Sequence, residues 1–221
     1  MDISIFDVIG PIMIGPSSSH TAGAAKLARI ARIISGDNIK KVSFGLHGSF
    51  AQTYKGHGTD KALVAGALGM NEDDENINNS FEIAKNKGFE YEIYEIQLYG
   101  VHENTVKMTF EMQDGAKNVI IGSSIGGGEI MISNINGFET EFNAKTPILL
   151  IRQKDLPGVV SEVTKILAKD NINIGVMKLS RKEKGSDAFC AIETDNEISN
   201  KVVEDIRCVA NIISVQALNI S

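Results

Sequence analysis

Hydroxyl and imidazole side chains gather in a short segment near the start of the chain. Residues 15–21 read Gly-Pro-Ser-Ser-Ser-His-Thr, and a helical stripe of Leu27, Ile30 and Ile34 follows. A helix start presents free backbone N–H groups that bind carboxylates and other anions, and His20 adds a base. The segment therefore predicts an anion-binding turn, although Ser and Thr are also the ordinary caps of any helix. No lysine follows in the pattern of a P-loop, which disfavours nucleotide hydrolysis.

A second polar segment, Lys55–Asp60, precedes a helix rich in Ala and Leu that should end at Gly69. His57 and Asp60 lie three residues apart at the start of this helix, so both could face one ligand. Either could instead cap the first helical N–H groups. We expect His57 and Asp60 to be catalytic together with His20.

Glycines and polar side chains mark two further candidates. Residues 122–128 read Gly-Ser-Ser-Ile-Gly-Gly-Gly after a β-rich run, and consecutive glycines allow unusual backbone angles and the close approach of another group. A plain loop is the alternative. Residues 101–104, Val-His-Glu-Asn, are a weaker candidate. The residues predicted to bind substrate are Ser18, Ser19, Thr21, Asn104, Ser124 and Gly126.

The elements that must position these segments are of mixed type. Residues 40–46 predict a strand, and the alternating apolar residues between 89 and 132 predict antiparallel strands with turns at Asp114-Gly115 and Asn136-Gly137. With the two helices, this pattern predicts an α+β domain of the substrate-binding type over residues 1–142.

From Thr146 onward the apolar pattern changes, and the order of elements becomes βαββαβ. This order is the ferredoxin-like arrangement. The predicted elements are strands at 147–153, 172–180, 187–194 and 212–218, a helix from Val159 with a stripe through Leu167, and a helix at 198–209.

The turn that ends the first of these strands is distinctive. Asp155-Leu156-Pro157-Gly158 leads directly into a helix, and Asn171-Ile172-Asn173-Ile174 opens the next strand. Residues 146–221 therefore resemble the ACT family of small-molecule-binding regulatory domains. The resemblance implies amino-acid sensing or the pairing of subunits. The predicted effector residues are Asp155, Leu156, Pro157, Gly158 and Asn173, and the alternative is a plain turn in a domain that only dimerises.

Composition excludes several classes of function. A net charge of −6 over 221 residues, with no basic stripe, argues against nucleic acid as a partner. No apolar run approaches the roughly 18 residues of a membrane span, and the first residues lack the basic start and the small-residue cleavage site of a signal peptide. We therefore expect a cytoplasmic protein without membrane contact. The two cysteines, Cys190 and Cys208, are too few for an iron–sulfur cluster with four thiolates. We therefore predict no metal ligands in this chain.

Taken in order, the polar segments resemble the β portion of iron–sulfur-dependent L-serine dehydratases. The resemblance spans essentially the whole chain. It rests on residues 6–11 (Phe-Asp-Val-Ile-Gly-Pro), 15–23, 47–49 (His-Gly-Ser), 55–60 and 124–128.

The resemblance carries expectations for individual residues and for partners. Residues 18–21 match the family's active-site loop, His57 and Asp60 match its second loop, and residues 102–104 match a less diagnostic element. It implies L-serine as substrate, a separate α subunit, and a four-iron four-sulfur cluster held by the cysteines of that subunit. The hydroxyls would bind the substrate carboxylate, and either His20 or His57 would move a proton. Self-association through the ACT domain, or a heterotetramer, would complete the assembly.

Two other functions stay open at this point. The chain could be a non-catalytic amino-acid sensor, which would bind an amino acid and leave serine unchanged. Alternatively, the N-terminal domain could be an allosteric anion-binding domain, similar to the substrate-binding domains of some phosphoglycerate dehydrogenases.

Overall fold

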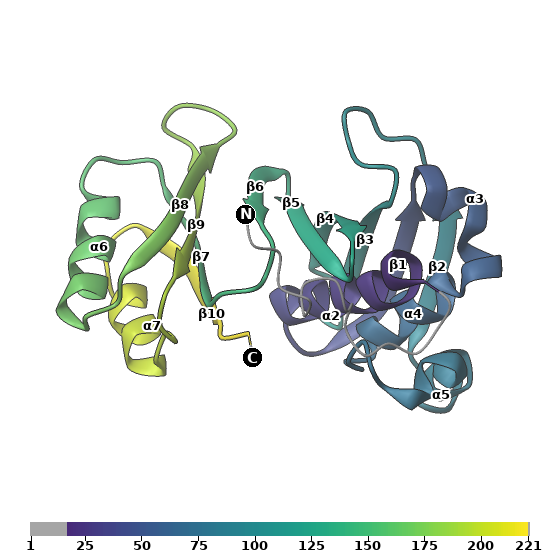
Figure 1. Ribbon diagram of the computed structural model, residues 1–221. Helices are drawn as coiled ribbons and strands as arrows, with labels where there is room; N and C mark the ends of the chain where they lie inside the picture. The colour runs from purple at the N-terminus through teal and green to yellow at the C-terminus, as the bar shows by residue number, and fades with distance from the viewer. Residues whose placement is uncertain (1–16, 221) are drawn as a thin grey trace, which may run out of the picture. The chain divides into compact units, whose positions relative to one another are not determined.

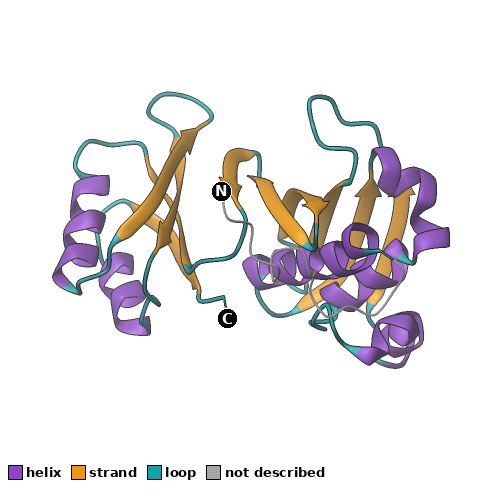
Figure 2. Ribbon diagram, in the orientation of Figure 1, coloured by secondary structure: helices purple, strands orange, loops and turns teal. Residues whose placement is uncertain are grey.

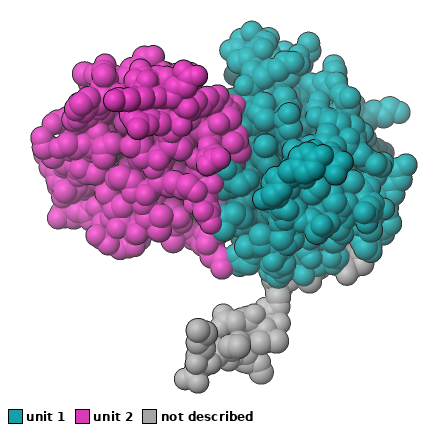
Figure 3. Space-filling view, turned by 90° about the horizontal axis from the view of Figure 1, so that it is seen from above, with its two compact units in different colours: residues 1–133 teal, residues 134–221 magenta. Residues whose placement is uncertain are grey.

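The computed structural model describes residues 17–220, and the chain divides into two compact units, residues 1–133 and 134–221 (Figure 3). Each unit contains both helices and strands, so the predicted α+β class is confirmed (Figure 2). No helix of the described part is long and apolar enough to cross a membrane.

The first unit is built on a sheet with the strand order β2-β1-β3-β4-β5 (Figure 1). Strand β3 pairs antiparallel with both β1 and β4, as the alternation predicts. Strand β2, however, runs parallel to β1, contrary to the antiparallel prediction. The helices between β1 and β2 return the chain to the end of the sheet from which β1 starts, and such a crossover makes the two strands parallel. The strands are β1 (Ile39–Leu46), β2 (Glu90–Glu95), β3 (Thr105–Met112), β4 (Lys117–Gly126) and β5 (Glu129–Ile135).

Helices α2 and α4 pack at unusually short range. A Cβ atom at Gly66 of α4 would lie 2.1 Å from the carbonyl oxygen of Ala25 in α2 and 2.9 Å from Ala28 Cβ. Small residues along both helices allow this approach, and Leu27 of α2 contacts the sheet at Gly122. The helical segments of the unit are η1 (Ser18–Ala22), α2 (Gly23–Ser35), α3 (Gly48–His57), α4 (Thr59–Ala67), η2 (Glu75–Asn79) and α5 (Ser80–Asn86).

Two predicted loops are helical. Ser17 caps a π-helical turn, η1, that continues into α2, so residues 18–21 lie within a helix. Residues 55–57 form the last turn of α3, a helix that was not predicted. Gly58 then takes a left-handed conformation with φ 69° and separates α3 from α4. Residues 6–11, 15 and 16, on which part of the resemblance rests, lie outside the described residues.

The second unit contains an antiparallel sheet with the order β10-β7-β9-β8. A core that includes Leu149, Ile192, Leu167 and Ile206 lies between this sheet and its two helices. Each predicted element is confirmed, with bounds that differ by at most two residues. The elements are β7 (Ile148–Lys154), α6 (Val159–Lys169), β8 (Ile174–Arg181), β9 (Asp187–Thr194), α7 (Asn200–Arg207) and β10 (Ile212–Leu218).

The short strand β6 (Phe138–Phe142) belongs to the second compact unit, although the sequence places it in the first domain. The ring of Phe138 stacks on Phe189 of β9 with centroids 5.9 Å apart. Lys178 of β8 also pairs with Glu141 at 3.2 Å. Residues 138–142 thus lie in the compact unit of residues 134–221, and the domain boundaries at residues 142 and 146 stay a prediction.

Candidate active site

Two histidines that are distant in the sequence lie side by side in the first unit. His20 lies in the π-helical turn η1 and His57 is the last residue of α3. Their ring centroids are 4.9 Å apart, with the rings at 74°. The structure thus brings together the two imidazoles that were predicted from separate segments.

His20 is held in place on several sides. Its Nε2 lies 3.1 Å from the hydroxyl of Ser49, and its backbone N–H donates to Ser17 Oγ at 3.2 Å. The ring also meets Phe50 edge to face, with a centroid distance of 5.3 Å. Ser49 and Phe50 both come from the first turn of α3, so this helix supplies the wall of the site.

A buried hydrogen bond ties the two histidine segments together. The hydroxyl of Thr21 donates to the backbone carbonyl of His57 at 3.2 Å, and Thr21 is only 3% exposed. Thr21 was predicted to bind substrate, but its hydroxyl is engaged with this carbonyl. Ser18 and Ser19, in the same turn, are half-buried and keep some exposure to solvent.

The electrostatic setting favours neutral His20. Burial, and secondly the positive charge that His57 can carry, lower the pKa of His20 below its usual value of 6.5. A lowered pKa leaves a ring nitrogen unprotonated at neutral pH. His20 can therefore accept a proton without first losing one.

Asp60 lies in the first turn of α4. Its carboxylate accepts the N–H of Lys61 at 2.8 Å. Burial and, secondly, the Asp60 charge raise the pKa of Tyr91 on β2. The catalytic role of Asp60 stays a prediction.

Ser124 is fully buried behind the π-helical turn. A Cβ atom at Gly23 would lie 2.1 Å from Ser124 Oγ, and that hydroxyl has no hydrogen-bond partner among the described residues. The N–H of Ser124 donates to the carbonyl of Asn104 at 3.0 Å. Ser124 therefore lies against Gly23, and the substrate-binding role of Ser124 and Asn104 stays a prediction. Gly126 has φ 103° in the turn between β4 and β5, where two more glycines also have positive φ.

His47 and Gly48, to which the sequence assigned no individual role, hold the loop that precedes α3. His47 Nδ1 accepts the N–H of Leu98 at 3.2 Å, and the His47 N–H donates to Thr105 at 3.0 Å. A Cβ atom at Gly48 would lie 2.5 Å from the carbonyl oxygen of Glu103, so only glycine fits. The His-Gly-Ser run at residues 47–49 was the only sign of this loop in the sequence. The role of each residue depends on contacts with residues 98–105, which the sequence does not show.

The cysteines do not form a metal site. No group of three or more His, Cys, Asp or Glu side chains suited to a metal ion occurs within residues 17–220. Burial raises the pKa of Cys190 to about 11, and Cys208 is exposed. Both belong to the second unit, so the chain offers no four-thiolate ligand set for an iron–sulfur cluster.

In the second unit, the predicted effector loop is tied to the β8–β9 hairpin. Asp155 accepts the N–H of Gly185 at 3.1 Å and a hydrogen bond from Arg181 at 2.7 Å, and these two donors lower its pKa. Leu156, Pro157 and Gly158 are exposed, with Gly158 at φ 91°. Asn173 instead donates to Asp195 at 2.6 Å.

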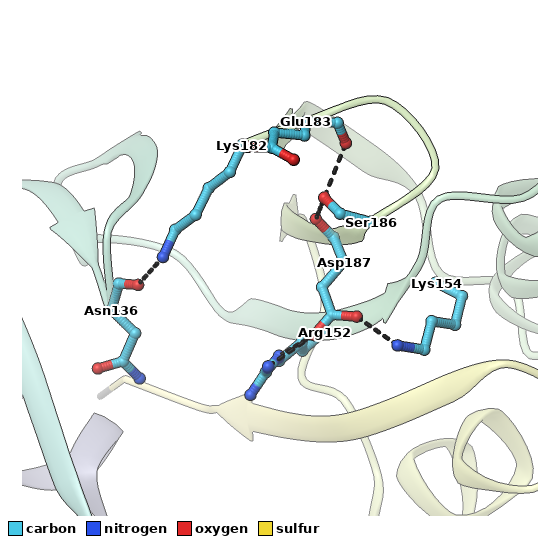
Figure 4. Close-up of polar contacts among 7 residues, drawn as sticks. All are labelled: Asn136, Arg152, Lys154, Lys182, Glu183, Ser186 and Asp187. Atoms are coloured by element: carbon cyan, nitrogen blue, oxygen red, sulfur yellow. Dashed lines mark hydrogen bonds and ion pairs between the residues drawn. The ribbon is translucent and has the colours of Figure 1, made fainter.

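The same hairpin carries a second set of polar contacts (Figure 4). Asp187 pairs with Arg152 at 2.6 Å and with Lys154 at 2.7 Å. Lys182 reaches across to the carbonyl of Asn136 at 3.0 Å and lies over the ring of Phe138. The hairpin is therefore attached both to the effector loop and to the turn before β6.

Two known protein families match separate parts of the chain. Residues 4–98 match the family described as "Serine dehydratase beta chain", and residues 148–209 match the family described as "ACT domain". The fold and the site thus define a dehydratase-type β domain joined to an ACT domain.

Individual relatives narrow the family further. The chain is 42% identical to the probable L-serine dehydratase β chain of Bacillus subtilis (strain 168), with 96% of each chain covered. It is 43% identical to the L-serine dehydratase β chain of Peptoniphilus asaccharolyticus over 91% of each. It belongs to the L-serine dehydratase β-chain family. A shorter match, 34% identical over 89 residues, is to D-3-phosphoglycerate dehydrogenase of Bacillus subtilis (strain 168) and covers 17% of that protein.

Proposed function

We propose that the chain is the β subunit of a cytoplasmic L-serine dehydratase that converts L-serine to pyruvate and ammonia together with an α subunit. The observation that carries the proposal is the cluster of His20, His57 and Ser49 beside a hydroxyl-bearing helix start. The relatives named as L-serine dehydratase β chains support the choice of substrate.

The residues of this chain would bind the substrate and move a proton. The partly exposed hydroxyls of Ser18 and Ser19 would hold the carboxylate of serine at the start of the helix formed by η1 and α2. His20, whose pKa is lowered, would act as the proton acceptor, and its contact with Ser49 would fix the direction of the ring. His57, whose ring lies beside that of His20, would belong to the same site.

A four-iron four-sulfur cluster is proposed to belong to the partner subunit. Cys190 is buried and Cys208 lies elsewhere on the second unit, so this chain does not fit the cluster. The α subunit would have to supply the cysteine ligands and close the site over the exposed ring of His57.

The second unit is proposed to regulate or assemble the enzyme. Its ACT domain contains neither histidine of the site. An effector amino acid would bind at the exposed loop of Leu156, Pro157 and Gly158, and the ACT domain would also pair subunits.

The test combines the two subunits. The chain and a candidate α subunit are purified anaerobically, separately and as a co-expressed complex, and pyruvate formed from L-serine is measured. We expect pyruvate from the complex only. The matched control is a complex with His20→Ala, which should lose about 10²- to 10⁴-fold in turnover. Pyruvate formed by the isolated chain, or a complex that binds serine and leaves it unchanged, would overturn the proposal.

A further inference from the structure

The first unit has a cavity at the end of the sheet opposite the histidines. Its volume is about 440 Å³, and it is lined where α2, α4 and α5 end and where β1 and β2 begin. β1 runs from this cavity to His47 over a length of roughly 23 Å, and α2 separates His20 from Arg32 by roughly 18 Å. The cavity is therefore distinct from the candidate active site.

Positive charge gathers in this cavity although the whole chain carries a net charge of −6. Arg32, Lys40 and Lys87 line it, against the single carboxylate of Glu90. Lys40 meets Glu111 only at 3.9 Å, and the charge of Glu90 also acts on Lys41 outside the cavity. The lining is thus left with an excess of positive charge.

The guanidinium of Arg32 has an unused donor. Its Nε is buried and has no hydrogen-bond partner among residues 17–220. It lies 3.6 Å from the position that a Cβ atom would take at Gly69, which holds the side chain against the end of α4. A buried N–H without an acceptor is unfavourable, so this atom favours a ligand that supplies one.

Cations near the ends of helices also interact with the helix dipole, and Arg32 and Lys87 stand at such positions. That interaction does not account for the unused Nε or for the open volume that Arg32 lines. A guanidinium with its planar set of donors matches the two oxygens of a carboxylate or phosphate group.

We propose that this cavity binds a small oxyanion with two negative charges, of the phosphate monoester or dicarboxylate type, through Arg32, Lys87 and Lys40. Two charges match the excess of cations over Glu90 in the lining. The volume admits a metabolite of a few carbon atoms.

The experiment uses the full chain without any partner, so its outcome is independent of the proposed dehydratase activity. Inorganic phosphate and malonate are titrated separately at constant ionic strength, and the NMR signals of the Arg32 Nε–H and the Gly88 amide are followed. We expect saturable shifts with at least one anion. Binding of phosphate alone identifies the phosphate class, and binding of malonate alone identifies the dicarboxylate class.

Three variants give the decisive comparison. Arg32→Met keeps the apolar stem and should weaken binding by about 10- to 100-fold. Lys87→Gln lies at an exposed position and should weaken binding without affecting folding. Arg207→Met is the matched control, because Arg207 also lies in the last turn of a helix but pairs with Glu204. Absence of saturation with both anions, or unchanged affinity in both Arg32→Met and Lys87→Gln, would overturn the proposal.

Discussion

The surroundings of the His20 imidazole change the pH at which it takes up a proton. Its pKa is lowered first by burial and secondly by His57. Between the lowered pKa and 6.5 the unfolded chain binds more protons than the folded chain. The free energy of unfolding contributed by this group is therefore fully present above pH 6.5 and is lost as the pH falls through that window.

Replacing His57 separates the two causes. In His57→Gln the charge effect disappears while the burial remains, so the pKa of His20 should rise but stay below 6.5. The NMR titration of the His20 ring carbons measures this directly. His102→Gln, which changes an exposed histidine elsewhere in the unit, should leave the titration unchanged. A His20 midpoint that does not move in His57→Gln would contradict the assigned contact.

Ser49 is a positioning residue in the proposed reaction, because it acts through His20. Ser49→Ala should lower kcat in the α–β complex by about 10-fold with little change in KM, because one hydrogen bond to the ring is lost. Ser49→Thr retains the hydroxyl and should restore most of the rate. Equal losses in both variants would instead indicate a packing defect.

The sequence could predict the two histidines of the site but not their surroundings. His20 and His57 stood out because each follows or precedes small and hydroxyl-bearing residues. The effect of the Asp60 charge on Tyr91 and the close approach of Ser124 to Gly23 both join residues that are distant in the sequence. No local pattern encodes such contacts.

At the scale of elements, two glycines in neighbouring helices predict opposite effects. Gly66→Ala should destabilise the first unit by about 1–3 kcal/mol, because its Cβ would overlap the backbone of α2. Gly56→Ala in α3 meets no atom within 4 Å and should stabilise by about 0.5–1 kcal/mol through helix propensity. Urea unfolding of both variants measures the difference. Equal effects would show that α2 and α4 do not pack at this distance.

The attachment of the β8–β9 hairpin gives a second test at this scale. Asp155→Ala removes the acceptor of the Gly185 N–H, and the exchange rate of that amide should rise about 10-fold. Asp170→Ala is the control, since Asp170 pairs with Lys201 and not with Arg181 or Gly185. Because the pKa of Asp155 is lowered, the Gly185 bond should persist below pH 3.8 and be lost as the pH falls through the lowered value. An amide shift that changes above pH 3.8 would contradict this bond.

The elements of the ACT domain were predictable because apolar residues recur in each of them with a clear period, of two residues in the strands and of three to four in the helices. Helix α3 was not, since glycines at both of its ends and several polar residues leave no apolar stripe. The parallel pairing of β2 was hidden for another reason. Alternation reports that a strand has one buried face but not which neighbour it pairs with.

At the scale of the whole molecule, each compact unit has its own core, so the second unit should be dispensable for chemistry. A chain that ends at Lys145, with Phe138→Ser to replace the ring that would lose Phe189, should still turn over serine in the α–β complex. Any response to an effector amino acid should disappear. Complete loss of turnover in a truncated chain that still assembles would show that the second unit takes part in catalysis.

The partner and its cluster could be expected only through the resemblance to a family. The count of two cysteines indicates that this chain cannot supply four thiolate ligands. It does not indicate which protein supplies them. Among the described residues, the exposed position of His57 agrees with the proposal that another surface completes the site.

The π-helical turn at residues 18–22 has a consequence for the helical phase of α2. Such a turn contains one more residue than an α-helical turn, and one residue corresponds to a rotation of about 100° around the axis. The buried face of α2 is fixed by Ala24, Leu27 and Ala28. Deleting one residue from the turn would leave this face in place and rotate Ser17 to another side of the helix. The extra residue therefore sets the angle between the buried face of α2 and the side of the helix on which Ser17 lies.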